Sequence, residues 1–362
     1  MLMTILQLVG GMAGLTIGGE LLVRGASKLA AAAKLSPLFI GLTVVAIGTS
    51  SPELIVSIST SLKGQGDLSL GNVVGSNIFN TLMILGLSAV VSPLIVKRQM
   101  IRFDVPCMIV GSLLIPLVAA DGWINRPEGI VLLSLLLLYT AAAYFMGRKD
   151  SKTTETVAHE LDLKPIKPTF RYLLTQVGII AVGLLLLVFG CEWFVGGAVQ
   201  IARNVGLSET VIGLTILAAG TSLPELVTSV VATLRNERDI AVGNVIGSNL
   251  FNVLGVLGAA AVFSSPGIQV AASMFQRDLP VMVGTALICL PIFASYGVIS
   301  RWEGLMLLGF YVLYTVYLIL STTGNPLAQQ VGQFAIYVAL PVALIVLTVT
   351  FVRSSRVKSQ VT

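Results

Sequence analysis

Two short motifs place an acid and a proline together inside apolar segments. The first reads GTSSPE and ends at Glu53, and the second reads GTSLPE and ends at Glu225. A proline leaves the carbonyl four residues before it without its helical partner, so Pro52 frees the carbonyl of Gly48, and that of Thr49 can also turn outward. Inside a membrane such backbone is tolerated only where it lines a cavity or finds a partner. The motifs therefore predict two broken helices that present oxygen atoms.

Each motif adds hydroxyl oxygens to the carboxylate and the carbonyls. The first copy supplies Thr49 and Ser50, and the second supplies Thr221 and Ser222. Hard cations such as Ca²⁺ and Na⁺ prefer oxygen ligands, and Ca²⁺ takes about six to eight of them. Soft metals prefer thiolate or imidazole, and the only histidine, His159, falls in a charged segment. These residues indicate a site for a hard cation.

A second pair of motifs offers further polar side chains. GNVVGSNIFN occupies positions 71–80 and GNVIGSNLFN occupies 243–252. Ser76 and Asn80 are four residues apart, so they share one face of a helix, and we expect that face to meet the broken helix of its own repeat. Asn77 is turned away from this face, and both ion binding and helix packing are open for it. The second copy carries the same residue types at Ser248, Asn249 and Asn252.

The glycines of this second motif pair are also four residues apart, at Gly71 and Gly75 and at Gly243 and Gly247. Small residues at this spacing allow two helices to approach closely inside a membrane. We expect both glycine pairs to lie at helix–helix contacts.

Two carboxylates at one buried site carry a charge of about −2. One Ca²⁺ neutralises this charge, and so do two Na⁺. A site that either ion neutralises, but that is too small for both together, exchanges them. Without a cation the two acids repel each other, so protons become competitors for the same site.

The composition places these motifs in a membrane protein. The chain has 362 residues, of which 55% are hydrophobic and 11% charged, and its mean hydropathy is +0.93. Apolar stretches of about 20 residues are long enough to span a bilayer. The three cysteines fall inside such stretches and are expected to be packing residues. We predict an all-α fold with eleven spans, at about 3–23, 37–62, 68–92, 104–120, 128–147, 172–201, 209–234, 240–264, 279–298, 302–321 and 331–352.

Charge predicts the orientation. Lys and Arg collect in cytoplasmic loops. Of the 22 Lys and Arg, all but Lys63, Arg126, Arg203 and Arg277 fall in loops on one side. The N-terminus is therefore predicted outside and the C-terminus in the cytoplasm. The net charge of +5 suggests contact with anionic lipid and not with nucleic acid.

The chain also contains an internal duplication. Residues 41–80 and 213–252 align without a gap, and about half of the positions are identical. Each half holds five predicted spans, and an odd number forces the second half to enter the membrane from the opposite side. We predict two inverted five-helix repeats, ten core spans in all, and one extra C-terminal transmembrane helix. The predicted boundaries are 1–147 for the first repeat, 148–171 for a cytoplasmic linker, 172–321 for the second repeat, and 322–362 for the extra helix and tail.

The paired GTS(S/L)PE and GNV(V/I)GSN(I/L)FN motifs, in two inverted halves, resemble the cation/Ca²⁺ exchanger superfamily, and within it the prokaryotic Na⁺/Ca²⁺ exchanger type. The resemblance covers about residues 1–321. It implies a site that both repeats share, and it implies that the first and sixth spans slide against the remainder to alternate access. The implied ligands are Glu53 and Glu225, the carbonyls of Thr49 and Thr221, the hydroxyls of Ser50, Ser222, Ser76 and Ser248, and the side chains of Asn80 and Asn252.

Several functions stay open beside the leading one. The leading hypothesis is a secondary antiporter that exchanges Na⁺ for Ca²⁺ in the plasma membrane of a prokaryote, with no catalytic residues and no cofactor. A Ca²⁺/H⁺ exchanger could use the same carboxylates as proton carriers. A sodium-coupled symporter for an organic solute also fits inverted repeats. No GxxxxGK[ST] motif is present for ATP binding. Away from the site, we expect Asp104 and Asp278 to be solvated or to cap helices.

Overall fold

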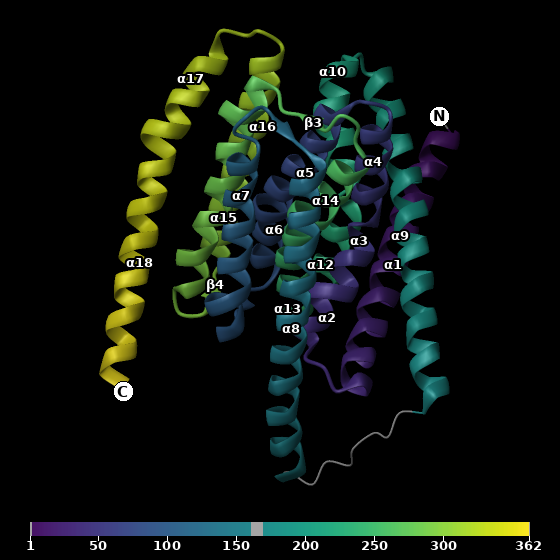
Figure 1. Ribbon diagram of the computed structural model, residues 1–362, viewed down its shortest axis with the longest axis vertical. Helices are drawn as coiled ribbons and strands as arrows, with labels where there is room; N and C mark the ends of the chain where they lie inside the picture. Colours follow the sequence, from purple (N-terminus) through teal and green to yellow (C-terminus); the bar gives the residue numbers. More distant parts are fainter. Residues whose placement is uncertain (1, 161–168, 362) are drawn as a thin grey trace.

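The computed structural model describes residues 2–160 and 169–361, and this part of the chain is a bundle of long helices (Figure 1). In the first half the elements are α1 (Leu2–Ala33), α2 (Pro37–Ile40), η1 (Gly41–Val45), α3 (Ala46–Thr49), α4 (Ser51–Leu62), α5 (Gly66–Phe79), η2 (Asn80–Ile84), α6 (Leu85–Val91), β1 (Leu94–Ile95), η3 (Met100–Asp104), α7 (Val105–Val118), β2 (Trp123–Ile124) and α8 (Arg126–Glu160). The label η marks π-helical segments.

The second half repeats this order and adds a final helix. Its elements are α9 (Phe170–Asn204), α10 (Glu209–Ile212), η4 (Gly213–Leu217), α11 (Ala218–Gly220), α12 (Leu223–Leu234), α13 (Arg238–Leu250), η5 (Phe251–Val256), α14 (Leu257–Phe263), β3 (Ile268–Gln269), η6 (Met274–Asp278), α15 (Leu279–Ala294), β4 (Val298–Ile299), α16 (Arg301–Thr322), α17 (Leu327–Phe334), η7 (Ala335–Ala339) and α18 (Leu340–Val361).

The described helices confirm an all-α membrane protein. Nine of them are long and apolar enough to cross a bilayer, and the bent pair 37–49 and 51–62 makes a tenth span. The predicted span 209–234 corresponds to this bent pair, but it is divided among α10, η4, α11 and α12. Several boundaries differ from the prediction. α1 continues past residue 23 to Ala33, α8 continues past residue 147 to Glu160, and α18 continues past residue 352 to Val361. α15 ends at Ala294, before the strand β4. Residues 161–168 of the predicted linker lie outside the described residues.

Two small antiparallel strand pairs join the halves. β1 pairs with β4, and β2 pairs with β3. β1 and β3 follow equivalent helices, α6 and α14, yet β3 lies at the upper end of the molecule in Figure 1, whereas β4, the partner of β1, lies at the lower end. Equivalent elements at opposite ends are the arrangement that an inverted duplication produces.

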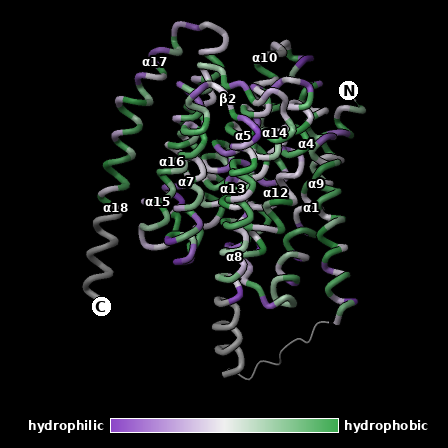
Figure 2. The backbone as a smooth tube through the Cα atoms, viewed as in Figure 1, coloured by the Kyte–Doolittle hydropathy of each residue, from purple (hydrophilic) through white to green (hydrophobic). Residues whose placement is uncertain are grey.

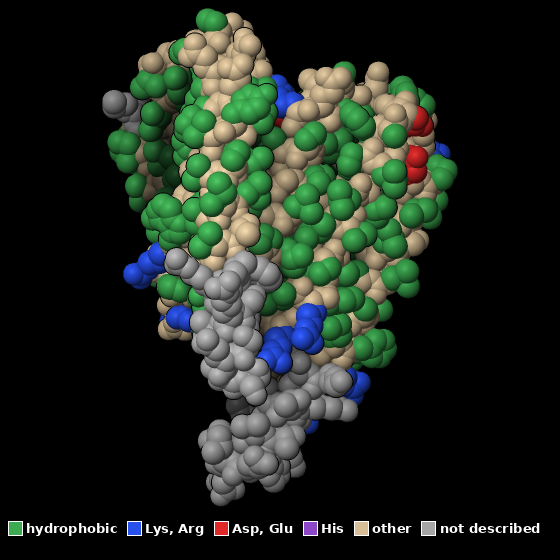
Figure 3. Space-filling model, turned by 90° about the vertical axis from the view of Figure 1, so that its left-hand side faces the viewer, with side chains coloured by type: hydrophobic (Ala, Val, Ile, Leu, Met, Phe, Trp, Pro, Cys, Tyr) green, Lys and Arg blue, Asp and Glu red, His purple; other side chains and the backbone are tan. Residues whose placement is uncertain are grey.

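Hydrophobic side chains cover the outside of the bundle. α9 and α16 are largely hydrophobic along their length, whereas hydrophilic residues inside the bundle gather around α5 and α13 (Figure 2). The face in Figure 3 carries a broad hydrophobic band, and most of its visible Lys and Arg lie near the lower end. In the most apolar stretches of α5–α6 and α13–α14, 78% and 89% of residues are buried, against 11% for α16. The two helices that carry the GSN motifs are therefore central.

Glycines bring α1 and α9 into backbone contact. A Cβ atom on Gly18 would lie 2.7 Å from the carbonyl oxygen of Gly183, and one on Gly190 would lie 2.7 Å from the nitrogen of Leu15. No side chain fits at such distances, because real Cβ contacts are longer. The first and sixth predicted spans thus touch along a smooth glycine-lined seam.

Candidate ion-binding site

The two proline motifs break their helices as predicted. Around the first, the axis bends by 46° between Thr49 and Ser51. Ser50 sits at the break, with φ −83° and ψ 10°, and its counterpart Ser222 has φ −92° and ψ 7°. The proline at the second position of each new helix suits the first turn, where its missing N–H leaves no bond unmade.

Each glutamate lies in the first turn of the helix that follows the break, Glu53 in α4 and Glu225 in α12. The partial positive charge of a helix N-terminus favours a carboxylate there. Both side chains are completely buried. A buried charge is strongly destabilising unless it is paired and hydrogen-bonded, so the surroundings of these carboxylates decide what they can do.

Each carboxylate accepts a hydrogen bond from the serine of the opposite motif. The Ser222 hydroxyl donates to Oε1 of Glu53 at 3.0 Å, and the Ser50 hydroxyl donates to Oε1 of Glu225 at 2.7 Å. The two acids therefore line one candidate site to which both halves contribute. This exchange of partners was not predicted.

The remaining predicted side chains are buried around the centre but lack partners. Among the described residues, no hydrogen-bond partner is available for Oε2 of either glutamate, for the hydroxyls of Ser76 and Ser248, or for either amide atom of Asn80 and Asn252. Asn80 begins the π-helical segment η2, and Asn252 lies in η5. Such π-helical turns inside longer helices are frequent at functional sites.

The helix contacts correct one expectation about these asparagines. α5 does pack against α4 of its own repeat, but η2, which carries Asn80, also packs against α12 of the other repeat, and η5 packs against α4. The Asn80 segment thus packs against the broken helix of the other repeat.

Thr49 and Thr221 each precede the serine at the helix break of their own repeat, and they differ in how deeply they are buried. Thr49 is buried, and Thr221 is partly exposed. The Thr221 hydroxyl donates to Oδ1 of Asn72 at 3.4 Å. The Thr49 hydroxyl is shared between Oδ1 of Asn244 at 3.2 Å and the Val45 carbonyl of its own repeat at 3.1 Å. The prediction assigned the carbonyls of these two threonines, and not their hydroxyls, to the ion.

Asn72 and Asn244 were missed as candidates. They stand four residues before Ser76 and Ser248, so the i, i+4 spacing that joined Ser76 to Asn80 also places Asn72 on that face. Asn77, by contrast, donates to the Asn249 carbonyl at 3.3 Å, which is a helix-packing contact between the repeats.

Cys191 on α9 was predicted to be a packing residue, yet it makes a specific contact. Its thiol donates to the Gly220 carbonyl at 2.8 Å, the carbonyl that Pro224 leaves without a helical partner.

The prediction that Asp104 and Asp278 are solvated or cap helices is wrong. Both side chains are buried and accept hydrogen bonds of 3.0 Å, from Tyr139 and from Tyr314.

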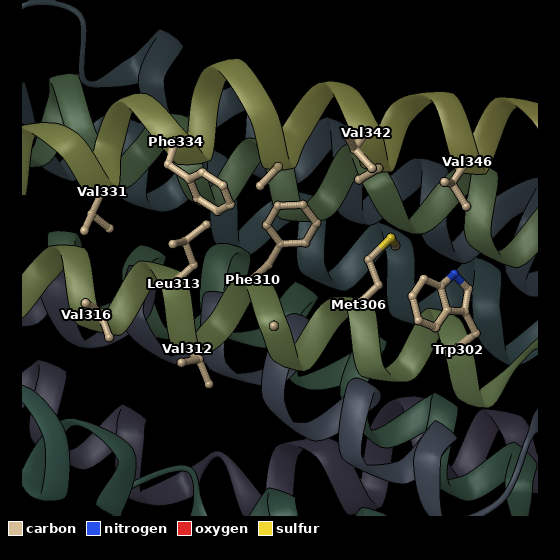
Figure 4. Close-up of a pocket in the computed structure, with 13 residues that line it drawn as sticks. Trp302, Met306, Phe310, Val312, Leu313, Val316, Val331, Phe334, Val342 and Val346 are labelled. Carbon is tan, nitrogen blue, oxygen red and sulfur yellow. The ribbon is translucent and has the colours of Figure 1, made fainter.

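An apolar cavity lies elsewhere in the molecule, between α16 and the C-terminal helices α17 and α18 (Figure 4). It has a volume of about 430 Å³, and Trp302, Met306, Phe310 and Phe334 are among its lining side chains. Hydrocarbon walls offer no ligands to a cation, so this cavity is not the candidate ion site.

The chain is similar to a known protein family and to several of its members. The model of the sodium/calcium exchanger protein family matches residues 3–145 and 175–320. The putative antiporter CaxA of Alkalimonas amylolytica is 37% identical over 329 residues, which cover 89% of this chain and 100% of CaxA. The sodium/calcium exchanger MaX1 of Methanosarcina acetivorans is 32% identical over 345 residues, covering 86% of this chain and 97% of MaX1.

A solved structure has the same fold. The sodium-calcium exchanger NCX_Mj, in crystals soaked with zero Na⁺ and Ca²⁺, superposes with a TM-score of 0.74 at 30% sequence identity, and the match covers 88% of this chain and 99% of that one. These findings confirm the resemblance that the paired motifs carry. The chain belongs to the sodium/calcium exchanger protein family.

Proposed function

We propose that this protein is a secondary antiporter that exchanges Na⁺ for Ca²⁺ by alternating access, with one ion site shared by both repeats. The proposed cage contains the carboxylates of Glu53 and Glu225 and the carbonyls of Thr49 and Thr221. Four hydroxyls and two amides complete it, from Ser50, Ser222, Ser76, Ser248, Asn80 and Asn252. The family membership and the names of the similar exchangers support this assignment.

The observation that carries the proposal is the set of unpartnered polar atoms. Oε2 of both glutamates, two serine hydroxyls and both asparagine amides are buried without partners among the described residues. An unsatisfied buried polar atom costs about 1–3 kcal/mol, and an unpaired buried charge costs several kcal/mol more. Coordination of a cation satisfies the oxygen atoms of this set, whereas a packing role leaves them without partners.

The charge of the cage accounts for exchange. A single Ca²⁺ balances the two carboxylates, and two Na⁺ balance them equally well. All other proposed ligands are neutral oxygens, which suit both ions. Competition for one cage couples inward movement of one ion to outward movement of the other.

The proposal includes an orientation and a division of the chain. We place the N-terminus outside and the C-terminus in the cytoplasm of a prokaryotic cell, with repeats at 1–147 and 172–321, a linker at 148–171 and an additional helix and tail at 322–362. The glycine seam holds α1 and α9 in close backbone contact, which supports movement of these two helices together as one unit.

The test is Ca²⁺ uptake by vesicles that contain the purified protein, with outward gradients of Na⁺, K⁺ and H⁺ imposed one at a time. We expect uptake only with Na⁺, and no effect when an ionophore collapses the pH gradient. Uptake that follows the pH gradient and ignores Na⁺ would identify a Ca²⁺/H⁺ exchanger. Na⁺-driven uptake of an organic solute with no Ca²⁺ movement would identify a symporter, and either result would overturn the proposal.

A further inference from the structure

Asn72 ties α5 to the first turns of α4. Its amide nitrogen donates to the main-chain carbonyl of Glu53 at 3.2 Å and to the hydroxyl of Ser57 at 2.9 Å. Asn244 repeats these contacts in the other half, where it donates to the Glu225 carbonyl at 3.3 Å and to the Ser229 hydroxyl at 2.9 Å. Both glutamates are therefore held through their backbone by an asparagine.

The third contact of each asparagine crosses to the other repeat. Oδ1 of Asn72 accepts from Thr221 at 3.4 Å, and Oδ1 of Asn244 accepts from Thr49 at 3.2 Å. Each of these amides thus uses its nitrogen twice and its oxygen once. Asn80 and Asn252 differ, because their amide atoms have no partner among the described residues.

These contacts close a ring. Asn72 holds the Glu53 carbonyl and the Thr221 hydroxyl, and Ser222, the residue after Thr221, donates to the Glu53 carboxylate. The equivalent ring runs through Glu225, Asn244, Thr49 and Ser50. Each ring fixes a carboxylate relative to the broken helix that faces it. Hydrogen bonds that share members in this way are strongly coupled.

We propose that Asn72 and Asn244 are positioning residues that set the spacing of the two carboxylates without binding the ion. The inference rests on the proposed function, because it assigns the asparagines to the same cage. Their side-chain oxygens are already occupied by threonine hydroxyls, so they act on the ion through Glu53 and Glu225.

The test compares Asn72→Ala, Thr221→Val and the double variant. Valine keeps the shape and the carbonyl of Thr221 and removes only its hydroxyl. Equilibrium Ca²⁺ binding in detergent and the KM and maximal rate of Ca²⁺ uptake in vesicles are measured for each. Thr221→Val removes one hydrogen bond of the ring, and Asn72→Ala removes all three that Asn72 makes. Because either change opens the ring, each should weaken Ca²⁺ binding and raise KM by about tenfold.

The double variant should bind Ca²⁺ no more weakly than Asn72→Ala alone, because either change opens the same ring. Ser69→Ala is the matched control, since Ser69 is buried one turn earlier on α5 and its hydroxyl has no partner among the described residues. It should keep the wild-type KM. If Asn72→Ala cannot be recovered folded, Thr221→Val and Asn244→Ala provide the same readout.

Wild-type KM and Ca²⁺ affinity in these variants would overturn the inference. A fall in maximal rate alone, or additive effects in the double variant, would overturn it as well, because a purely structural role predicts both. If the wild-type protein itself neither binds Ca²⁺ nor takes it up against a Na⁺ gradient, the proposed function fails first. The two failures are therefore distinguishable.

Discussion

The hydroxyl of Ser50 donates a hydrogen bond of 2.7 Å to the carboxylate of Glu225, which lies in the other half of the chain. Ser222 returns the contact to Glu53 at 3.0 Å. Neither half alone thus forms a complete set of contacts around its own acid. Movement of one broken helix changes the surroundings of both carboxylates, which is what an exchanger with one shared site requires.

Neutralising either acid should nearly abolish Ca²⁺ transport. Glu53→Gln or Glu225→Gln leaves one negative charge, which no longer balances a divalent ion in a buried site. We expect Ca²⁺ uptake into vesicles to fall by about 100-fold or more. Asp67→Asn is the control, because Asp67 is an exposed acid on α5. Wild-type rates in either glutamine variant would contradict the site.

Much of this site follows from residue types and spacing. The proline and glutamate of each motif predict a broken helix with a buried acid, and the spacing of Ser76 and Asn80 places them on one face. These features are local, so a single sequence is enough to infer them.

The sequence does not show which helices pack against each other or which side chains form hydrogen bonds between them. Periodicity places Asn72 and Asn80 on the same face, but it does not say that Asn72 is fully hydrogen-bonded while both amide atoms of Asn80 lack described partners. The π-helical turn that starts at Asn80 depends on packing against the other repeat. The expectation for Asp104 fails for the same reason, because its hydrogen-bond partner Tyr139 lies on another helix, α8.

The serine contacts across the repeats can be tested singly. Ser50→Ala removes the hydrogen bond to Glu225, and a bond to a charged group is worth about 1.5–3 kcal/mol. We expect a rise of about tenfold or more in the Ca²⁺ KM. Ser51→Ala is a close control, since the adjacent Ser51 hydroxyl donates to the Ile47 carbonyl of its own repeat, at 2.9 Å. Equal effects of the two changes would argue against the cross-repeat contact.

Adding a third acid should change which ions compete. Asn80→Asp converts a cage with a charge of about −2 into one of about −3, and such a site needs an additional monovalent ion or a proton for balance. We expect Ca²⁺ uptake to become dependent on K⁺ or on pH, as measured in vesicles at several pH values with and without K⁺. Asn325→Asp on the exposed α16–α17 connection is the control. Unchanged profiles would mean that Asn80 is a packing residue.

The glycines of the two GSN motifs differ in how closely other helices approach them. A Cβ atom on Gly247 would lie 2.5 Å from the Leu42 carbonyl oxygen, because η1 packs tightly on α13. At the equivalent Gly75 on α5, no atom from another described helix lies within 4 Å of the Cβ position. The expectation that both glycine pairs form close contacts holds only for the second pair.

Because the repeats are inverted, the opposite conformation should exchange these two environments, with η4 closed onto Gly75 and η1 released from Gly247. Gly75→Leu fits the conformation described and blocks the other. We expect Ca²⁺ binding to stay near the wild-type value while transport turnover falls by about tenfold or more. Gly284→Leu is the matched control, since Gly284 also has no described atom within 4 Å of its Cβ position. Normal turnover with Leu at position 75 would exclude closure of η4 onto α5 as the second gate.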